Sequence, residues 1–156
     1  MLNIVLFEPE IPANTGNIIR LCANTGAQLH LIQPLGFLLD DKRLRRAGLD
    51  YHEWVNIHQY ANLADYLERA HPRRLLAMTT KGSQRYTDVA FTEGDALIFG
   101  PESRGLPAAF LNAQAAEHKL YLPMRPENRS LNLSNSVAIV LFEAWRQMGF
   151  VGAAQK

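Results

Sequence analysis

The sequence predicts an α/β fold in which helices cover both faces of a mostly parallel sheet. The first observation is that short apolar runs alternate along the chain with stretches of helical periodicity, which is the pattern of strand–helix–strand units. The second is that three of these apolar runs end in loops rich in Gly, Pro, Asn and Ser. Parallel strands end at a common edge of a sheet, so these loops are expected to meet there.

The strands are expected where apolar residues cluster between turn-forming residues. In chain order they are 2–7, 28–33, 74–80, 95–99 and 118–122. The strand at 95–99 runs into a loop in which Gly100 and Gly105 allow a close backbone approach or a positive φ. The strand at 118–122 ends at Pro123, before a polar loop.

The helices are expected in the stretches between these strands. In chain order they are 15–25, 40–47, 61–70, 107–113 and 134–148. Gly26 and Gly149 stand where the C-terminal caps of the first and last helices belong. Ser134 or Asn135 is expected to be the N-cap of the last helix, because short polar side chains accept hydrogen bonds from free backbone N–H groups there.

The composition is that of a globular protein, with 47% apolar and 20% charged residues in 156 positions. We expect one domain over residues 1–156. The formal net charge is only +1, so any contact with nucleic acid has to come from local patches. The single cysteine, Cys22, is expected to be a buried thiol, and one cysteine excludes a disulfide framework. No signal peptide or membrane span is recognisable, and the expected compartment is the cytoplasm.

The polar loop before the last helix is the clearest sign of a ligand site. Six small hydrogen-bonding side chains crowd between an apolar strand and an apolar helix: Asn128, Ser130, Asn132, Ser134, Asn135 and Ser136. Helix capping uses one or two of them, and a ligand with many polar edges would use the rest. The glycine fingerprint of dinucleotide sites and the Walker loop are both absent, and the spacing around Ser103 does not fit a nucleophile elbow. The five histidines show no metal-ligand spacing, so no metal is expected.

Four ordered segments, 11–26, 40–51, 99–107 and 130–135 followed by 143–147, together resemble the SPOUT superfamily of RNA methyltransferases. The nearest similarity is to its short tRNA 2′-O-methyltransferases. The resemblance implies S-adenosylmethionine as cofactor and a C-terminal trefoil knot. It also implies methylation of the wobble ribose, cytidine 34 or 5-carboxymethylaminomethyluridine 34, in leucine-type tRNAs.

The same resemblance implies roles for particular residues. Met78, Gly100, Leu122 and Ser130 would hold the cofactor, largely through main-chain groups, with Leu131 packed close by. Arg20, Asn132 and Ser134 would be catalytic. Arg20 would face the reacting ribose, where its guanidinium can hold a phosphate or stabilise a developing 2′-alkoxide, although an arginine in an apolar helix is more often explained by a salt bridge. Glu102 is ranked below Arg20 and would either pair with a cationic partner or shape its loop.

The charged helix at 40–47 has two interpretations. It is either a solvated face, with acids at its N-terminus favoured by the helix dipole, or a phosphate-binding patch. The family context favours the patch, with Lys42, Arg43 and Arg46 as RNA ligands. Four further arginines are candidates to join it, namely Arg73, Arg74, Arg125 and Arg129.

The last helix predicts a homodimer. An apolar stripe runs along it, widened by Val140 and Phe142, and its members are Val137, Leu141, Ala144, Trp145 and Met148. Such a stripe is too wide for one buried face of a small domain. The close relatives often carry Tyr in place of Phe142, so Phe142 is not counted among the functional residues.

Three alternative functions remain open at this stage. A same-fold enzyme could act on ribosomal RNA or another tRNA position, which an additional N-terminal RNA-binding segment would favour. A non-catalytic protein could bind RNA or cofactor, which loss of Arg20 or of the 130–134 loop would favour, and both are present. A Rossmann-type small-molecule enzyme is disfavoured by the missing glycine fingerprint.

Overall fold

The computed structural model describes residues 1–156 and is built around a seven-stranded sheet in which every strand pairing is parallel. The strand order is β3-β2-β1-β6-β4-β7-β5. The strands are β1 (Asn3–Phe7), β2 (Gln28–Ile32), β3 (His58–Tyr60), β4 (Leu75–Met78), β5 (Gln84–Arg85), β6 (Ala96–Phe99) and β7 (Lys119–Tyr121). The carboxyl ends of β4, β6 and β7 therefore lie side by side at one edge, as the sequence predicts.

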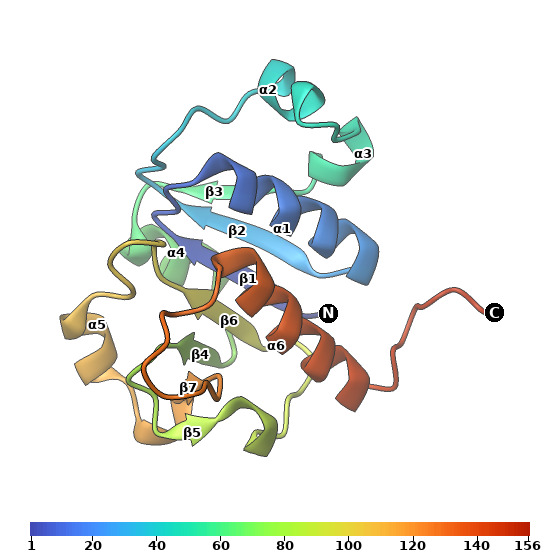
Figure 1. Ribbon diagram of the computed structural model, residues 1–156. Helices are drawn as coiled ribbons and strands as arrows, with labels where there is room; N and C mark the ends of the chain where they lie inside the picture. The colour runs from blue at the N-terminus through green and yellow to red at the C-terminus, as the bar shows by residue number, and fades with distance from the viewer.

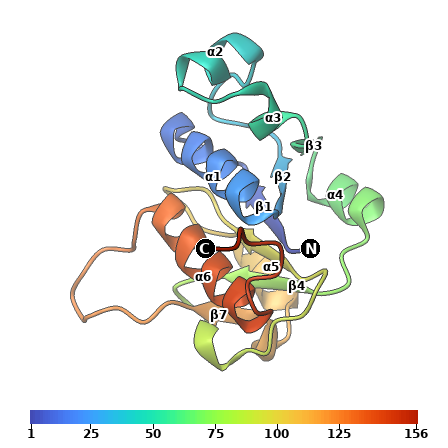
Figure 2. The same cartoon turned by 90° about the vertical axis from the view of Figure 1, so that its right-hand side faces the viewer.

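Helices cover both faces of this sheet, which confirms the predicted layering (Figure 1). They are α1 (Pro12–Thr25), α2 (Asp41–Arg46), α3 (Tyr51–Trp54), α4 (Leu63–Ala70), α5 (Ala108–Ala113) and α6 (Leu133–Gln147), with short 3-10 turns η1 (Tyr86–Asp88) and η2 (Ala116–His118). Side chains of α1, α2, α3 and α6 pack on one face, against Ile4 and Leu97. Side chains of α4 and α5 pack on the other, against Val5 and Ile98. Figure 2 shows α1 and α6 next to each other on their shared face.

Several expectations are corrected by the structure. Helix α1 begins at Pro12 rather than at residue 15, because proline is well suited to the first turn of a helix. Strands β3 and β5 and helix α3 were not predicted, and each has four residues or fewer. The N-cap of α6 is Asn132, neither Ser134 nor Asn135, since its side chain accepts from the backbone N–H groups of those two residues. Gly26 caps α1 with φ of +78°, as expected, and Gly149 has φ of +70° just beyond α6.

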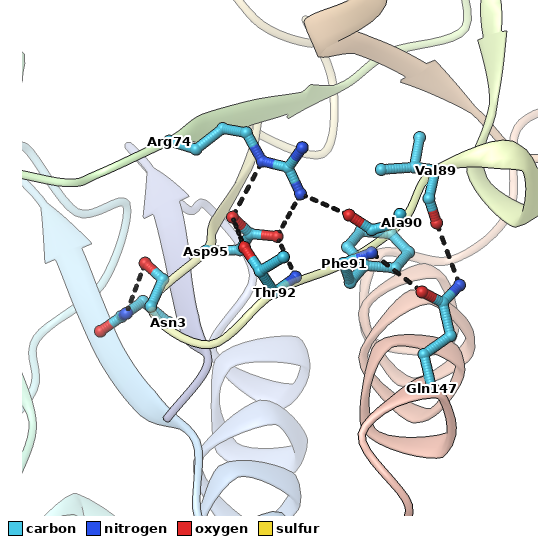
Figure 3. Close-up of polar contacts among 9 residues, drawn as sticks. Asn3, Arg74, Val89, Ala90, Phe91, Thr92, Asp95 and Gln147 are labelled. Atoms are coloured by element: carbon cyan, nitrogen blue, oxygen red, sulfur yellow. Dashed lines mark hydrogen bonds and ion pairs between the residues drawn. The ribbon is translucent and has the colours of Figure 1, made fainter.

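A polar network at the amino edge of the sheet fixes the segment before β6 (Figure 3). The Asp95 carboxylate is buried and accepts two hydrogen bonds from the Arg74 guanidinium, at 2.9 and 2.5 Å, and one from the Thr92 backbone N–H at 2.8 Å. Gln147, at the end of α6, accepts from the Phe91 N–H and donates to the Val89 carbonyl. Arg74 is therefore an ion-pair partner in this network, and its place in a phosphate-binding patch stays a prediction.

Cys22 is buried, as predicted, and burial raises the pKa of its thiol to about 12. No helix combines the length and the apolar character that crossing a membrane would require.

Candidate functional site

A cavity of about 530 Å³ opens at the carboxyl edge of β4, β6 and β7. Its walls come from residues 78–81 after β4, residues 99–106 after β6, the start of α1, and the segment that leads into α6. Figure 1 shows this last segment, drawn in orange, crossing the sheet edge from β7 to α6. The three loops singled out from the sequence thus form one site, because the parallel sheet brings their strand ends together.

The five residues predicted to hold a cofactor all line this cavity, namely Met78, Gly100, Leu122, Ser130 and Leu131. Their backbone positions follow directly from their places at strand ends and in the α6 approach loop. Gly100 is required for a further reason. A Cβ at this position would lie 2.3 Å from the backbone carbon of Gly105 and the nitrogen of Leu106, so only glycine lets the loop fold back on itself.

Of the residues predicted to be catalytic, Asn132 lines the cavity and Ser134 does not. The Oδ1 atom of Asn132 accepts from the backbone N–H of Ser134 at 2.9 Å and from its hydroxyl at 2.6 Å. These contacts fix the Asn132 amide at the start of α6. Its Nδ2 group makes no hydrogen bond within the chain and is left as a donor at the cavity wall. The contact of Ser134 with this site is its pair of hydrogen bonds to Asn132, and its catalytic role stays a prediction.

Arg20 does not line the cavity. Its Nε donates to Glu53 Oε2 at 2.9 Å, and its Nη2 donates to the Gly48 carbonyl. Glu53 also accepts from the Asp50 backbone N–H, as part of the capping box of α3. The hydrogen bond with Arg20 lowers the pKa of Glu53, and the same bond raises the pKa of Arg20. In this structure, therefore, the salt bridge expected of an ordinary helical arginine is present, and a role at the ribose stays a prediction.

A carboxylate clamp, made by Glu10 and Glu102, joins two loops of the site, and its crossed contacts were not predicted. Glu102 accepts from the backbone N–H groups of Glu10 and Ile11, both at 2.8 Å, and from the Asn14 side chain at 3.2 Å. Glu10 in turn accepts from the backbone N–H and the hydroxyl of Ser103, at 2.8 and 2.7 Å. These bonds from Ser103 lower the pKa of Glu10, with a further contribution from the Arg104 charge.

This clamp holds the loop after β1 against the loop after β6, and both loops form cavity walls. The sequence contained a signal for it. Two acids follow strand ends that become neighbours in the sheet, Glu10 after β1 and Glu102 after β6. The crossed pattern, in which each acid binds the other's loop, depends on the strand order and is not visible in the sequence.

The predicted RNA ligands Lys42, Arg43 and Arg46 are exposed on α2, away from the cavity. Asp40 caps this helix by accepting from the Arg43 backbone N–H at 2.8 Å, and it also pairs with the Arg43 guanidinium. Lys42 and Arg46 take part in no ion pair, so their charges face solvent. No group of three His, Cys, Asp or Glu side chains in the chain is arranged to hold a metal ion.

Comparisons with known proteins agree with this geometry. The family described as SpoU rRNA Methylase matches residues 1–142. A tRNA (cytidine(34)-2′-O)-methyltransferase of Escherichia coli K12 is 60% identical over 153 residues, which cover 98% of each chain. A solved structure that concerns 2-OH methylation of C/U34 on tRNA has a TM-score of 0.86 and 43% identity, and the match covers 96% of this chain and 97% of that one.

An AdoMet-bound rRNA methyltransferase from Sinorhizobium meliloti has a TM-score of 0.79 and 27% identity, over 94% of this chain and 56% of that one. The family match extends over most of the chain, and the E. coli relative is aligned almost from end to end. The resemblance seen in the four sequence segments is thereby confirmed, and the chain belongs to the SpoU rRNA methylase family.

Proposed function

We propose that this chain transfers the methyl group of S-adenosylmethionine to the ribose 2′-hydroxyl of nucleotide 34 of tRNA. The observation that carries the proposal is the near full-length identity of 60% to an enzyme named for that reaction on cytidine 34. The cavity at the strand ends supports it, because the residues expected from the family resemblance gather there. The proposed catalytic domain comprises residues 1–156, and the proposed compartment is the cytoplasm, where tRNA is processed.

The cavity fits the cofactor in size and chemistry. A volume of about 530 Å³ is within the range of small-molecule sites, and nine of its 22 lining residues are hydrophobic. Side chains such as Met78 and Leu122 can cover the faces of an adenine ring while main-chain groups at the strand ends meet its polar edges. S-adenosylmethionine, when bound, supplies an electrophilic methyl group on a sulfonium. Met78, Gly100, Leu122, Ser130 and Leu131 are the residues proposed to hold it.

The proposed work of the chain is to orient the ribose and to stabilise charge. The free Nδ2 donor of Asn132 can bind the ribose or the cofactor, and Ser134 keeps that amide in place. Arg20 stays protonated and is a poor base, so its proposed role is to bind a phosphate or to lower the free energy of the developing 2′-alkoxide. Methyl transfer depends mainly on in-line orientation, which such contacts provide.

RNA binding is proposed to involve Lys42, Arg43 and Arg46 on α2, together with the anticodon region of tRNA. Phosphate contacts by exposed lysine and arginine supply most non-specific affinity for nucleic acid. The solvent-facing charges of Lys42 and Arg46 support this role.

We further propose a homodimer built on α6. Phe142 and Ile139 on this helix are large apolar side chains that are 44% and 39% exposed, while Val137, Val140 and Leu141 of the same helix are fully buried. An exposed apolar face beside a buried one is typical of an isologous interface.

A C-terminal trefoil knot completes the proposal. The loop after β4 lies so close to β7 that a Cβ on Gly82 would stand 2.5 Å from the Leu120 carbonyl carbon. After β7 the chain crosses the sheet edge again before it enters α6, which packs on α1. Such tight crossing of the last segments is what threading of the chain would require.

The test is to incubate the purified protein with labelled S-adenosylmethionine and tRNA transcripts, and to locate the methylated ribose by mass spectrometry of nuclease fragments. The matched control is the same tRNA with a 2′-deoxyribose at position 34. Methylation of the first substrate and not of the second is expected. Methylation at another tRNA position or only of ribosomal RNA would replace the proposal with the same-fold alternative.

A further inference from the structure

A second cavity, of about 400 Å³, lies near the amino ends of β1 and β2, away from the first. It is bordered by β3, by α4 and by the turn at residues 71–73, and Figure 2 shows α4 beside β3. No residue lines both cavities. None of the residues proposed for methyl transfer lines this second cavity.

The lining of the second cavity is basic. It includes Arg69, Arg73, His58 and His71, and no Asp or Glu lines it. Arg73 takes part in none of the nine ion pairs of the chain. Arg69 is paired with the Asp65 carboxylate just outside the lining, so Arg73 carries the unpaired positive charge of this pocket.

The floor of the cavity is a rigid, neutral aromatic cluster centred on His30, which is only 5% exposed. The Asn3 Oδ1 atom can only accept, so the His30 Nε2–H donates to it at 2.9 Å. The Nδ1 atom then accepts from the Tyr60 hydroxyl at 2.8 Å. Burial, with a smaller contribution from His58, lowers the pKa of His30 to about 4 and keeps it neutral. The His58 ring stacks on the His30 ring, and the two ring centroids are 5.1 Å apart.

The donors on this floor and wall are fixed in place before any ligand arrives. The Arg69 guanidinium lies 4.7 Å over the Tyr60 ring and donates to Asp65 at 3.1 Å and to the Gln59 carbonyl at 3.2 Å. Tyr66 lines the cavity while being 1% exposed, and its hydroxyl makes no hydrogen bond within the chain. The hydroxyl oxygen reaches the cavity surface, since Thr15 Oγ1 is the only buried side-chain polar atom without a partner, and so it is a donor open to a ligand.

We propose that this second cavity binds a phosphate group, supplied either by the backbone of an RNA or by free inorganic phosphate. The Tyr66 hydroxyl and the Arg73 guanidinium are the donors that would meet its oxygens, and Arg69 adds positive charge. A metal cation is disfavoured by the same lining, because hard cations need carboxylate or carbonyl oxygens. The assignment goes beyond the methyl-transfer site and does not rest on it.

The first arm of the test titrates inorganic phosphate into the intact protein and follows the imidazole signals of His58 and His71 by carbon-resolved NMR. Chloride at equal ionic strength is the solvent control. Saturable shifts of these signals are expected, with at least a roughly tenfold weaker affinity in Arg73→Gln and in Tyr66→Phe, since each removes one donor to an oxyanion. Arg85→Gln, an exposed arginine outside the cavity, is the matched control and should bind phosphate like the wild type.

The second arm measures tRNA affinity as a function of salt in the same variants. If the phosphate belongs to the RNA backbone, Arg73→Gln reduces the slope of log K against log [salt] by about 1. If it is free phosphate, the phosphate affinity seen by NMR is weakened in Arg73→Gln and the tRNA slope is unchanged. No saturable phosphate shift together with an unchanged slope would overturn the proposal. A protein that failed to methylate tRNA would leave the phosphate titration intact, so the two proposals fail separately.

Discussion

Replacing Glu102 with Gln tests whether the loop clamp holds the strand-end cavity in its binding shape. The carboxylate serves three donors, the N–H groups of Glu10 and Ile11 and the amide of Asn14. Glutamine is nearly isosteric, but it keeps one oxygen and places an NH2 group where the second oxygen stood. One or two of the three donors would therefore face another donor instead of an acceptor.

The size of the effect follows from these contacts. A hydrogen bond to a charged group contributes about 1.5–3 kcal/mol, and the partial exposure of this site puts each loss near the lower value. Two lost bonds then cost about 3 kcal/mol of unfolding free energy, or roughly 6–12 °C in Tm for a chain of this length. Because both joined loops form cavity walls, re-ordering them on binding should also weaken the affinity for S-adenosylhomocysteine about tenfold, which corresponds to about 1.4 kcal/mol.

The assay pairs thermal unfolding with calorimetric titration of S-adenosylhomocysteine. Glu68→Gln is the control, since Glu68 is exposed on α4 and takes part in no ion pair. Glu102→Gln should lower both stability and affinity, and Glu68→Gln neither. A large fall in Tm with unchanged affinity would show that the cavity does not depend on the clamp. An unchanged Tm would refute the reasoning altogether.

Three further predictions follow from particular side chains. Arg20→Ala should leave cofactor affinity intact and slow methyl transfer to tRNA by roughly 10²-fold or more, while Arg46→Ala should mainly raise the apparent KM for tRNA; equal kcat values for Arg20→Ala and wild type would contradict the proposed role. The pKa of His30, lowered to about 4 from 6.5 by burial and by His58, means that only the unfolded chain takes up this proton between those pH values. Unfolding free energy, measured in urea, should fall by at most about 3 kcal/mol as pH drops from 7 to 4, and His30→Gln should flatten that slope; parallel curves would exclude His30 as the cause. Phe142→Glu should convert a dimer to a monomer in sedimentation with an unchanged circular dichroism spectrum, and a monomeric wild type would contradict the dimer.

The lining of the strand-end cavity was predictable from the sequence because it depends on the position of the backbone more than on side-chain partners. Met78, Gly100 and Leu122 stand at or just beyond the ends of strands that apolar clustering identifies. A parallel sheet puts these ends on one edge, and the strand order β6-β4-β7 makes them neighbours. A family resemblance adds the approach loop at Ser130 and Leu131, and the cavity lining agrees with it.

The missed elements and contacts share a different cause, since they depend on tertiary partners. Strands β3 and β5 have three and two residues, too few for a periodic pattern, and exist through pairing with β2 and β7. The N-cap of α6 is Asn132 rather than Ser134 or Asn135, although all three side chains can cap a helix. The reason is that the helix begins one residue earlier than expected. The Glu102 clamp requires β1 and β6 to be adjacent, which only the strand order reveals.

Arg20 was predicted in two ways, as an ion-paired helical arginine and, from the family resemblance, as a catalytic residue. The ordinary expectation for a helical arginine, an ion pair, describes the structure, since Glu53 and the Gly48 carbonyl hold its guanidinium. That contact does not argue against a role in the reaction, because the Arg20 side chain is 51% exposed and an RNA phosphate offers the same charge in a bidentate geometry. Glu53 belongs to α3, and Gly48 to the turn that follows α2, the helix with the solvent-facing basic residues. The pairing therefore ties the proposed catalytic arginine to the proposed RNA-binding segment, so that RNA bound on α2 would lie next to the side chain it needs.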